Sequence, residues 1–373
     1  MNENPLFFAP RLSKSSTHPI DFFARWTKYS QKMSSVSKGE FTSINMVVRL
    51  RNTKSFAYES IQSDTLKLSL LDPLSKGFFR DSVAFWRVLK NSEISPNIVI
   101  AGDNYFGFLV PYIYRFISRS RYRIQISIHH SLKPIFRNEF NPIRFIKYIG
   151  LRRIVSLADS IRTVSIENRK YLINNWRVPP FKIIVAPIPL VIPGSIPQEV
   201  EAFSIGFLGR MHPERGLETW MQIIEKYSRS HHDIKVILAG EGTMRKNFLS
   251  GLSSILPEKQ ITYFGNLSAS ELEAFWKTCS VLLSTAEEES YGMSIREAVL
   301  NGRKVVAKSN SGTREVQRIF PGAIYLFSSE EEAIKKLDEA FDTNLTVLEV
   351  DSYRRYQSEE DQRSLESLVE SWL

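Results

Sequence analysis

The sequence alternates short apolar runs with intervals long enough for a helix, and this alternation limits the possible fold more than any other feature. The runs in the first half are LFFAPRL (6–12), INMVVRL (44–50), NIVIAG (97–102), RIQISIHH (123–130) and IRTVSI (161–166). Short buried strands at such intervals are typical of a parallel sheet covered by helices on both faces. The first half is therefore predicted to be an α/β domain.

The second half repeats the alternation, with strands predicted at FSIGFLG (203–209), IKVILAG (234–240), ITYFGNL (261–267), VLLST (281–285), KVVAKS (304–309) and AIYLF (323–327). Helical patterns lie between them, and SGTRE (311–315) is predicted to be a turn. This arrangement predicts a second Rossmann-like domain, in which ligands bind at the carboxyl ends of the strands.

A proline-rich run separates the two halves, with Pro187, Pro189, Pro193 and Pro197 close together. Because proline cannot continue a helix or a central strand, this run is predicted to be the interdomain linker. We therefore predict an N-terminal domain at 1–195, a C-terminal domain at 196–350 and a helical tail at 351–373. The tail is charged and helix-prone, and it is expected to pack, with a return to the first domain as one arrangement.

Charge is distributed unevenly between the halves. Residues 1–195 contain 29 Lys and Arg against 12 Asp and Glu, a net charge of +17, while the remainder carries −8. Aromatic residues are interleaved with the basic ones, as in Phe136, Phe140, Phe145 and Tyr148. This mixture suits an anionic membrane surface. A solvated surface and single-stranded nucleic acid are the alternatives, although the sequence has no nucleic-acid-binding motif.

The sequence has neither a basic segment before its first apolar run nor an apolar stretch long enough to span a bilayer. Its one cysteine, Cys279, cannot form an internal disulfide and is interpreted as a small core residue. The chain is therefore expected in the cytoplasm, either free or peripherally bound to the inner membrane face.

The stretch EESYGMSIREAVLNG (288–302) carries the strongest signal for a site. Glu289 and Glu297 stand eight positions apart, and a helical pattern begins between them at Met293. Unpaired amides at a helix start attract phosphate, and carboxylates accept hydrogen bonds from sugar hydroxyls. The pattern therefore indicates a nucleotide-sugar site.

Other candidate residues follow the predicted strands. Gly209 and Arg210 end one strand, Arg215 lies in the same loop, and Gly240 and Gly265 follow two further strands. Glycine lets the backbone approach a ligand, and arginine binds diphosphate through charge-assisted hydrogen bonds. For each arginine, a surface ion pair is the alternative interpretation.

In order and spacing, the motifs at 209–216, 239–242, 265–267 and 288–315 resemble the retaining glycosyltransferases of the GT-B fold, group 1 (family 4). The resemblance is specific from about Phe203 to Glu315 and weaker at 158–189. It implies two Rossmann-like domains facing across a cleft and a metal-independent, hexosyl-type transferase.

The resemblance also implies roles for individual residues. Glu289 would contact hydroxyls of the transferred sugar, and Glu297 would bind the ribose. Arg210 and Arg215 would hold the diphosphate, together with backbone amides around the run Gly292, Met293 and Ser294. His129, or His130 as the alternative, would be the active-site histidine near sugar and acceptor, whereas a histidine simply hydrogen-bonded at a strand end is the structural alternative.

The family usually has lysine where Arg215 stands, and the glycine pair common after its first strand is missing here. No Asp-x-Asp pair occurs in the sequence, so neither a metal nor another cofactor is expected beside the nucleotide-sugar substrate. The acceptor is expected to be a glycan or a lipid-linked molecule of surface polysaccharide or lipopolysaccharide synthesis. The alternative function is a non-catalytic module that binds nucleotide or glycan, and nucleic acid is not an expected partner.

Overall fold

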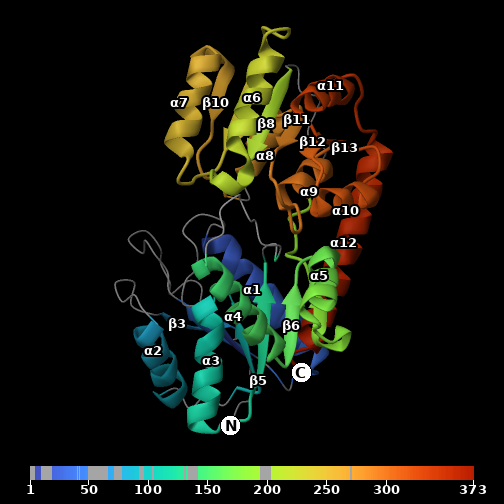
Figure 1. The fold of residues 1–373 in the computed structure, drawn as a ribbon. Coiled ribbons are helices and arrows are strands. Elements are labelled where there is room, and N and C mark those ends of the chain that lie inside the picture. Colours follow the sequence, from blue (N-terminus) through green and yellow to red (C-terminus); the bar gives the residue numbers. More distant parts are fainter. Residues whose placement is uncertain are drawn as a thin grey trace. The chain divides into compact units, whose positions relative to one another are not determined.

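The computed structural model describes residues 5–9, 19–39, 41, 43–48, 66–70, 78–91, 96–102, 105–129, 132, 142–193, 203–268 and 271–373. The chain divides into two compact units. Unit 1 comprises Met1–Lys14, Phe22–Ile188 and Gln362–Leu373, and unit 2 comprises Ser15–Asp21 and Pro189–Asp361. Each unit contains one parallel sheet with helices around it (Figure 1), so the predicted fold class is confirmed.

The sheet of unit 1 has the strand order β3-β2-β1-β4-β5-β6-β7, with every pair parallel. Its strands are β1 (Leu6–Ala9), β2 (Ile44–Val48), β3 (Leu66–Leu70), β4 (Ile98–Ala101), β5 (Arg123–Ile128), β6 (Ser160–Thr163) and β7 (Ile183–Val185). The helices of the first half are α1 (Pro19–Val36), α2 (Phe78–Asn91), α3 (Tyr105–Ser118), α4 (Pro142–Ser156) and α5 (Ile166–Trp176).

Strands β4 and β5 form the centre of this sheet because their Val, Ile and Ala side chains are buried on both faces. The five predicted runs all contain strands, although each strand is shorter than its run. Strand β3, with the sequence LKLSL, was not predicted. Its Lys67 and Ser69 interrupt the apolar run, which makes it resemble an exposed segment.

The last residues of the chain complete the core of unit 1. The indole of Trp372 stacks on Trp26 with ring centroids 5.9 Å apart, and its Nε1 donates to Oε1 of Gln125 at 2.9 Å. Leu368 and Val369 are buried in the same cluster. Helix α12 (Val347–Glu370) thus begins in unit 2 and ends in unit 1.

The sheet of unit 2 has the strand order β10-β9-β8-β11-β12-β13, again with every pair parallel. Its strands are β8 (Ser204–Leu208), β9 (Lys235–Ala239), β10 (Ile261–Tyr263), β11 (Val281–Ser284), β12 (Lys304–Lys308) and β13 (Ile324–Phe327). The helices are α6 (Leu217–Ser228), α7 (Arg245–Ile255), α8 (Leu272–Thr278), α9 (Met293–Leu300), α10 (Ser311–Ile319) and α11 (Glu330–Phe341).

The turn predicted at 311–315 is instead the beginning of α10, so that prediction was wrong. Asn310 forms a capping box with Thr313, whose amide donates to the Asn310 side chain at 3.0 Å. A side-chain cap of this kind satisfies amides that a helix start otherwise leaves unpaired. Ser-Gly-Thr therefore opens a helix here, although the same residues are common in turns.

Cys279 has the structural role expected of it. It is buried at the end of α8, and burial raises the pKa of its thiol to about 12. A Cβ on Gly206, in the neighbouring strand β8, would lie 2.4 Å from its sulfur. The thiol therefore fills space that a side chain at Gly206 would need. Among the described residues, no helix is long and apolar enough to cross a membrane.

Candidate functional site

The strand order of unit 2 identifies the edge at which a ligand is expected. Strands β8 and β11 are neighbours, and the chain extends the sheet in opposite directions from this pair. In open parallel sheets, ligands bind outside the carboxyl ends of the strands at such a switch point. The loops after β8 and β11 contain Arg215 and Glu289, respectively.

Glycine residues join the loops at this edge. Gly209 and Gly240 have φ angles of 152° and 124°, and a Cβ on Gly240 would lie 1.9 Å from the carbonyl oxygen of Gly209. The Gly209 amide donates to Ala239 O at 3.1 Å, and the Gly240 amide donates to Gly265 O at 2.6 Å. The loops after β8, β9 and β10 are therefore linked through backbone that leaves no room for a side chain at Gly240.

The backbone of Arg215 is fixed against the end of β11. Gly216 follows it with φ 65°, and a Cβ there would lie 2.1 Å from Thr285 O. The Thr285 hydroxyl lies 3.0 Å from Arg215 O and 2.9 Å from Gly216 O, which both accept from it. This contact sets the position of Arg215 relative to the loop that carries Glu289.

Glu289 is held from its other side by the start of α10. A Cβ on Gly312 would lie 2.1 Å from Glu289 O, and the Asn310 side-chain amide donates to Ala286 O at 3.0 Å. The loop between β11 and α9 thus lies between the Arg215 loop and α10. Its position depends on close backbone contacts on both sides.

The guanidinium of Arg215 donates a hydrogen bond to the carboxylate of Glu289 and forms an ion pair with it. The side chains are 27% and 7% exposed, respectively, so solvent screens this pair less than a surface pair. The Nε of Arg215 is buried and has no hydrogen-bond partner in the described part of the chain. Arg215 therefore retains a donor that an oxygen of a ligand could accept.

Arg210 lies in the same loop but in a different environment. It pairs with Glu214 at 3.4 Å, and both side chains are more than one-third exposed. This contact matches the alternative interpretation of a surface ion pair. The structure thus brings Arg215 and Glu289 together and places Arg210 in a separate pair.

Helix α9 begins with uncapped backbone beside Glu289. Gly292, with φ 71°, occupies the N-cap position and has no side chain that could cap the helix. The first amides, those of Met293 and Ser294, lie at a helix start with no acidic residue in the first turn. Such an N-terminus favours an anion.

Glu297 lies in the second turn of the same helix. Its side chain is half-buried, and burial raises the pKa of its carboxyl to about 7. Across the described ranges, its carboxylate has no hydrogen-bond or ion-pair partner, while its backbone oxygen accepts from Asn301 Nδ2 at 2.8 Å. The Glu297 carboxylate could therefore accept a hydrogen bond from a ligand hydroxyl.

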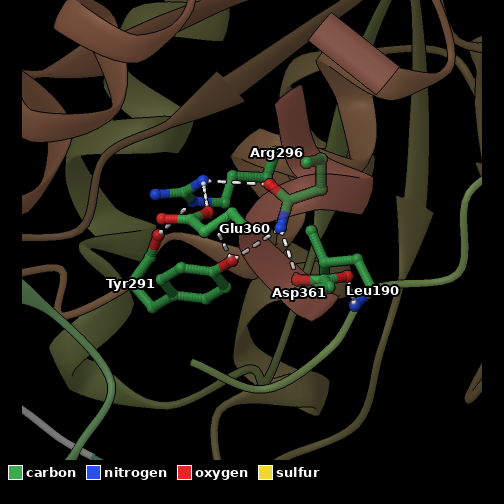
Figure 2. Close-up of polar contacts among 6 residues, drawn as sticks. Leu190, Tyr291, Arg296, Glu360 and Asp361 are labelled. Atoms are coloured by element: carbon green, nitrogen blue, oxygen red, sulfur yellow. Dashed lines mark hydrogen bonds and ion pairs between the residues drawn. The ribbon is translucent and has the colours of Figure 1, made fainter. Parts of the chain in front are cut away.

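A buried polar cluster connects this stretch to α12, and sequence reasoning missed it. Arg296, which is 1% exposed, donates to Gln357 Oε1 and Glu360 Oε2, both at 3.0 Å. Figure 2 shows Arg296 beside Tyr291 and Glu360. The guanidinium lies over the ring of Tyr291, 4.1 Å from its centroid, and Nε donates to Tyr291 O at 3.2 Å. The start of α9 is thus tied to residues about sixty positions later.

Asp361 completes this cluster (Figure 2). Its carboxylate accepts from Gln357 Nε2 at 2.7 Å and from the Leu190 amide at 3.1 Å. Burial raises the pKa of Asp361 to about 6, although both hydrogen bonds act in the opposite direction. The one feature of the sequence that could have indicated this cluster was Arg296 itself, a charged residue that stands between the apolar residues Ile295 and Ala298 in a short helix.

The two candidates for the active-site histidine are His129 and His130. His129 directly follows β5 in unit 1 and is half-buried, and its role stays a prediction. His130 lies outside the described residues. In the part of the chain that is described, no group of three or more His, Cys, Asp or Glu side chains is arranged to hold a metal ion.

Part of this chain is similar to a known protein family. Residues 194–360 match the model of the family described as glycosyl transferases group 1. The matched residues include Arg210, Arg215, Glu289 and Glu297, whereas Leu190 and Asp361 of the buried cluster lie outside the match. A GDP-mannose-dependent alpha-mannosyltransferase of Mycolicibacterium smegmatis is 26% identical over 112 residues, which are 30% of this chain and 27% of the relative. The chain therefore aligns with about a third or less of the length of such curated relatives.

Solved structures resemble the whole chain. Anabaena HepE in complex with UDP-glucose has a TM-score of 0.71 at 13% identity, covering 99% of this chain and 98% of HepE. The apo form of the lipopolysaccharide outer core galactosyltransferase WaaB has a TM-score of 0.63 at 18% identity, covering 91% of this chain and 90% of WaaB. At these identities the likeness establishes the shared fold of two parallel-sheet α/β domains.

Proposed function

We propose that this chain transfers a sugar from a nucleotide-sugar donor to a glycan or lipid-linked acceptor. The observation that carries the proposal is the Arg215–Glu289 pair, which lies at the switch point of unit 2 and beside the uncapped start of α9. A cation, a carboxylate and a row of backbone amides at one edge suit a ligand with a diphosphate and hydroxyls. The family match of residues 194–360 supports the same reading.

Each residue then has a proposed role. Glu289 accepts hydrogen bonds from hydroxyls of the transferred sugar, and Glu297 accepts them from the ribose. Arg215 offers its unpartnered Nε to a phosphate oxygen, while the amides of Met293 and Ser294 face the same anion. Arg210 breaks its exposed ion pair with Glu214 and binds the diphosphate instead. Such a surface pair contributes less than about 1 kcal/mol, so it is readily exchanged.

The chemistry follows from where charge develops. Cleavage of the bond between sugar and diphosphate creates positive charge at the anomeric carbon and negative charge on the leaving group. Fixed cations and helix amides directed at the phosphates lower that barrier. With these groups in place, the reaction proceeds without a metal. Retention of configuration, with the departing phosphate helping to accept the acceptor's proton, and a role for His129 near the acceptor are parts of the proposal.

The proposed acceptor and location follow from a structural neighbour and its printed name. One structural neighbour is named as a lipopolysaccharide outer core galactosyltransferase, which supports a role in surface polysaccharide or lipopolysaccharide synthesis. That role places the enzyme in the cytoplasm, at the inner membrane face. A hexose is the proposed sugar.

The second candidate is a non-catalytic module that binds nucleotide or glycan. Such a module needs the anion site at α9 but has no requirement for a carboxylate beside the sugar. The close backbone contacts that position Glu289 favour the enzyme, because they fix a side chain that nucleotide binding alone would not use.

One experiment distinguishes the two candidates. UDP-, GDP- and ADP-sugars are screened by thermal shift, because a ligand that binds only the folded state raises the melting temperature. Nucleotide release from the donor selected is then measured for the wild type, Glu289→Ala and Glu287→Ala. Glu287 is a matched control, since it lies two residues away in an exposed pair with Lys308.

We expect release by the wild type and by Glu287→Ala, and a loss of roughly a hundredfold in Glu289→Ala. Binding of the donor without release, with glycan and lipid-linked acceptors alike, would favour the module. Equal release by all three proteins would remove Glu289 from the reaction.

A further inference from the structure

Helices α2, α3 and α4 form one continuous layer on unit 1, here called the α2–α4 face. The ring of Phe85 on α2 meets Tyr114 on α3 edge-on, with centroids 5.5 Å apart. The hydroxyl of Tyr112 on α3 donates to Ile154 O on α4 at 3.1 Å. Figure 1 shows α2 and α3 side by side, in blue and cyan. Side chains that point outward from these helices therefore share one surface.

This surface exposes large apolar side chains. Phe116 and Ile117, adjacent at the end of α3, are 85% and 73% exposed. Among the described side chains of the three helices, the exposed large hydrophobic residues are Val83, Trp86, Ile113, Phe116, Ile117 and Ile149. Exposed apolar groups that occur singly need no explanation, but a set spread over three packed helices marks an interaction surface.

Of the aromatic residues predicted to lie among the basic ones, Tyr148 has a described side chain, and the side chain of Phe145 is not described. Tyr148 points into unit 1, where its hydroxyl is 2.7 Å from that of Tyr171 and accepts from Trp176 Nε1 at 2.7 Å. Phe136 and Phe140 lie outside the described residues. Among the side chains that the structure describes on this face, Trp86 and Phe116 are the exposed aromatic residues.

Basic residues outnumber acidic ones in the three helices of the face. Helices α3 and α4 contain no Asp or Glu, whereas Arg115, Arg144, Lys147, Arg152 and Arg153 lie within them. Helix α2 adds Arg80, Arg87 and Lys90 against Asp81. Arg87, Lys90, Arg152 and Arg153 are exposed, and the Lys90 Nζ lies 4.9 Å from the centroid of the Trp86 ring. Arg115 is paired with Asp159 at 2.7 Å, so that acid is already engaged.

We propose that the α2–α4 face docks onto an anionic lipid bilayer. Phe116, Ile117 and Trp86 would enter the boundary between headgroups and acyl chains, while the surrounding arginines and lysine contact anionic headgroups. Each basic residue near such a surface strengthens binding by about fivefold. Aliphatic side chains beside the rings favour lipid over nucleic acid, since bases stack on aromatic side chains and gain little from isoleucine.

The test is flotation of the full chain with vesicles. One vesicle is phosphatidylcholine alone, and the other is equimolar phosphatidylcholine and phosphatidylglycerol. The apolar variant is Phe116→Ser with Ile117→Ser, and the charge variant is Arg152→Glu with Arg153→Glu. A matched control is Val347→Ser with Leu348→Ser, because these adjacent residues of unit 2 are 62% and 81% exposed. Circular dichroism and thermal unfolding verify that each variant is folded.

We expect binding to the phosphatidylglycerol vesicles alone, weakened by salt because the attraction is screened. The apolar and charge variants should each lose roughly tenfold or more in binding, and the control should bind like the wild type. Failure of the wild type to bind, or equal binding by the Phe116 and Ile117 variant, would overturn the proposal. So would a dimer, seen in sedimentation velocity, that this variant abolishes, because a second copy would then be the occupant of the face. Vesicle binding needs neither donor nor acceptor, so its outcome is separate from that of the transferase proposal.

Discussion

The guanidinium of Arg215 is hydrogen-bonded to the carboxylate of Glu289, 74 positions later in the chain. Thr285 connects the two loops by donating to the carbonyl oxygens of Arg215 and Gly216. The pair therefore joins the two sides of the switch point of unit 2. In the proposed reaction a phosphate oxygen accepts from the Nε of Arg215, and Glu289 accepts hydrogen bonds from hydroxyls of the sugar.

Replacement of Arg215 by alanine should destabilise the protein as well as abolish transfer. Glu289, whose side chain is 7% exposed, would lose its charged partner, and this should lower the free energy of unfolding by about 1–3 kcal/mol. Arg210→Ala is the control, because its exposed pair with Glu214 contributes less than about 1 kcal/mol. Urea denaturation measures both. An equal decrease in the free energy of unfolding for both substitutions would show that burial of the Arg215–Glu289 pair adds nothing to stability.

Replacement of Glu297 by glutamine should change how stability depends on pH. Burial raises the pKa of this carboxyl from its ordinary value of 4.5 to about 7, so between these values the folded chain binds more protons than the unfolded chain. The free energy of unfolding of the wild type should therefore fall as pH rises through this window, by up to about 3 kcal/mol. Glu297→Gln cannot ionise and should lack this decrease.

The measurement is urea denaturation of both proteins at several pH values between 4.5 and 8. The pKa of Asp361 is also raised, to about 6, and it adds a slope of the same sign to both proteins. The difference between wild type and Glu297→Gln cancels that contribution. A difference that does not vary with pH would contradict the prediction.

Replacement of Arg296 by lysine should be costly although the charge is kept. Lysine cannot reach Gln357, Glu360 and Tyr291 O at the same time, so buried partners would be left unpaired. We expect the free energy of unfolding to fall by about 2–4 kcal/mol. Arg229→Lys is the comparison, since Arg229 forms an exposed pair with Glu225 and the change there should be within about 0.5 kcal/mol. Thermal or urea unfolding of both variants tests this, and similar values would contradict it.

Replacement of Gly240 by alanine should disrupt the contacts between the loops that follow β8, β9 and β10. The Cβ of Gly240→Ala would lie 1.9 Å from Gly209 O, so the backbone would have to move. Gly265 also has a positive φ angle, 73°, but a Cβ added there would have no atom within 4 Å. We expect Gly265→Ala to cost about 1 kcal/mol of stability and Gly240→Ala clearly more, with loss of nucleotide-sugar binding. Melting temperatures and calorimetric titration of the donor would show the difference.

The two-sheet fold could be predicted because its strands are apolar on both faces. Runs such as IVIA in β4 and KVILA in β9 have no other stable location than the interior of a sheet covered by helices. Strand β3, with the sequence LKLSL, was not predicted because polar residues alternate with its leucines and interrupt the apolar run. The start of α10 was wrongly predicted to be a turn. The capping hydrogen bond between Asn310 and Thr313 depends on geometry that residue types alone do not specify.

The sequence by itself determined the succession of strands and helices, the spacing of Glu289 and Glu297 and the basic character of the first half. These properties are local, since they depend on neighbours along the chain. Only the tertiary structure decided that Arg215 meets Glu289, that Arg296 reaches Glu360, and that Trp372 packs against Trp26 in unit 1. Such pairings join residues far apart in sequence, and they depend on how the sheets, close glycine contacts and helix ends bring side chains into reach.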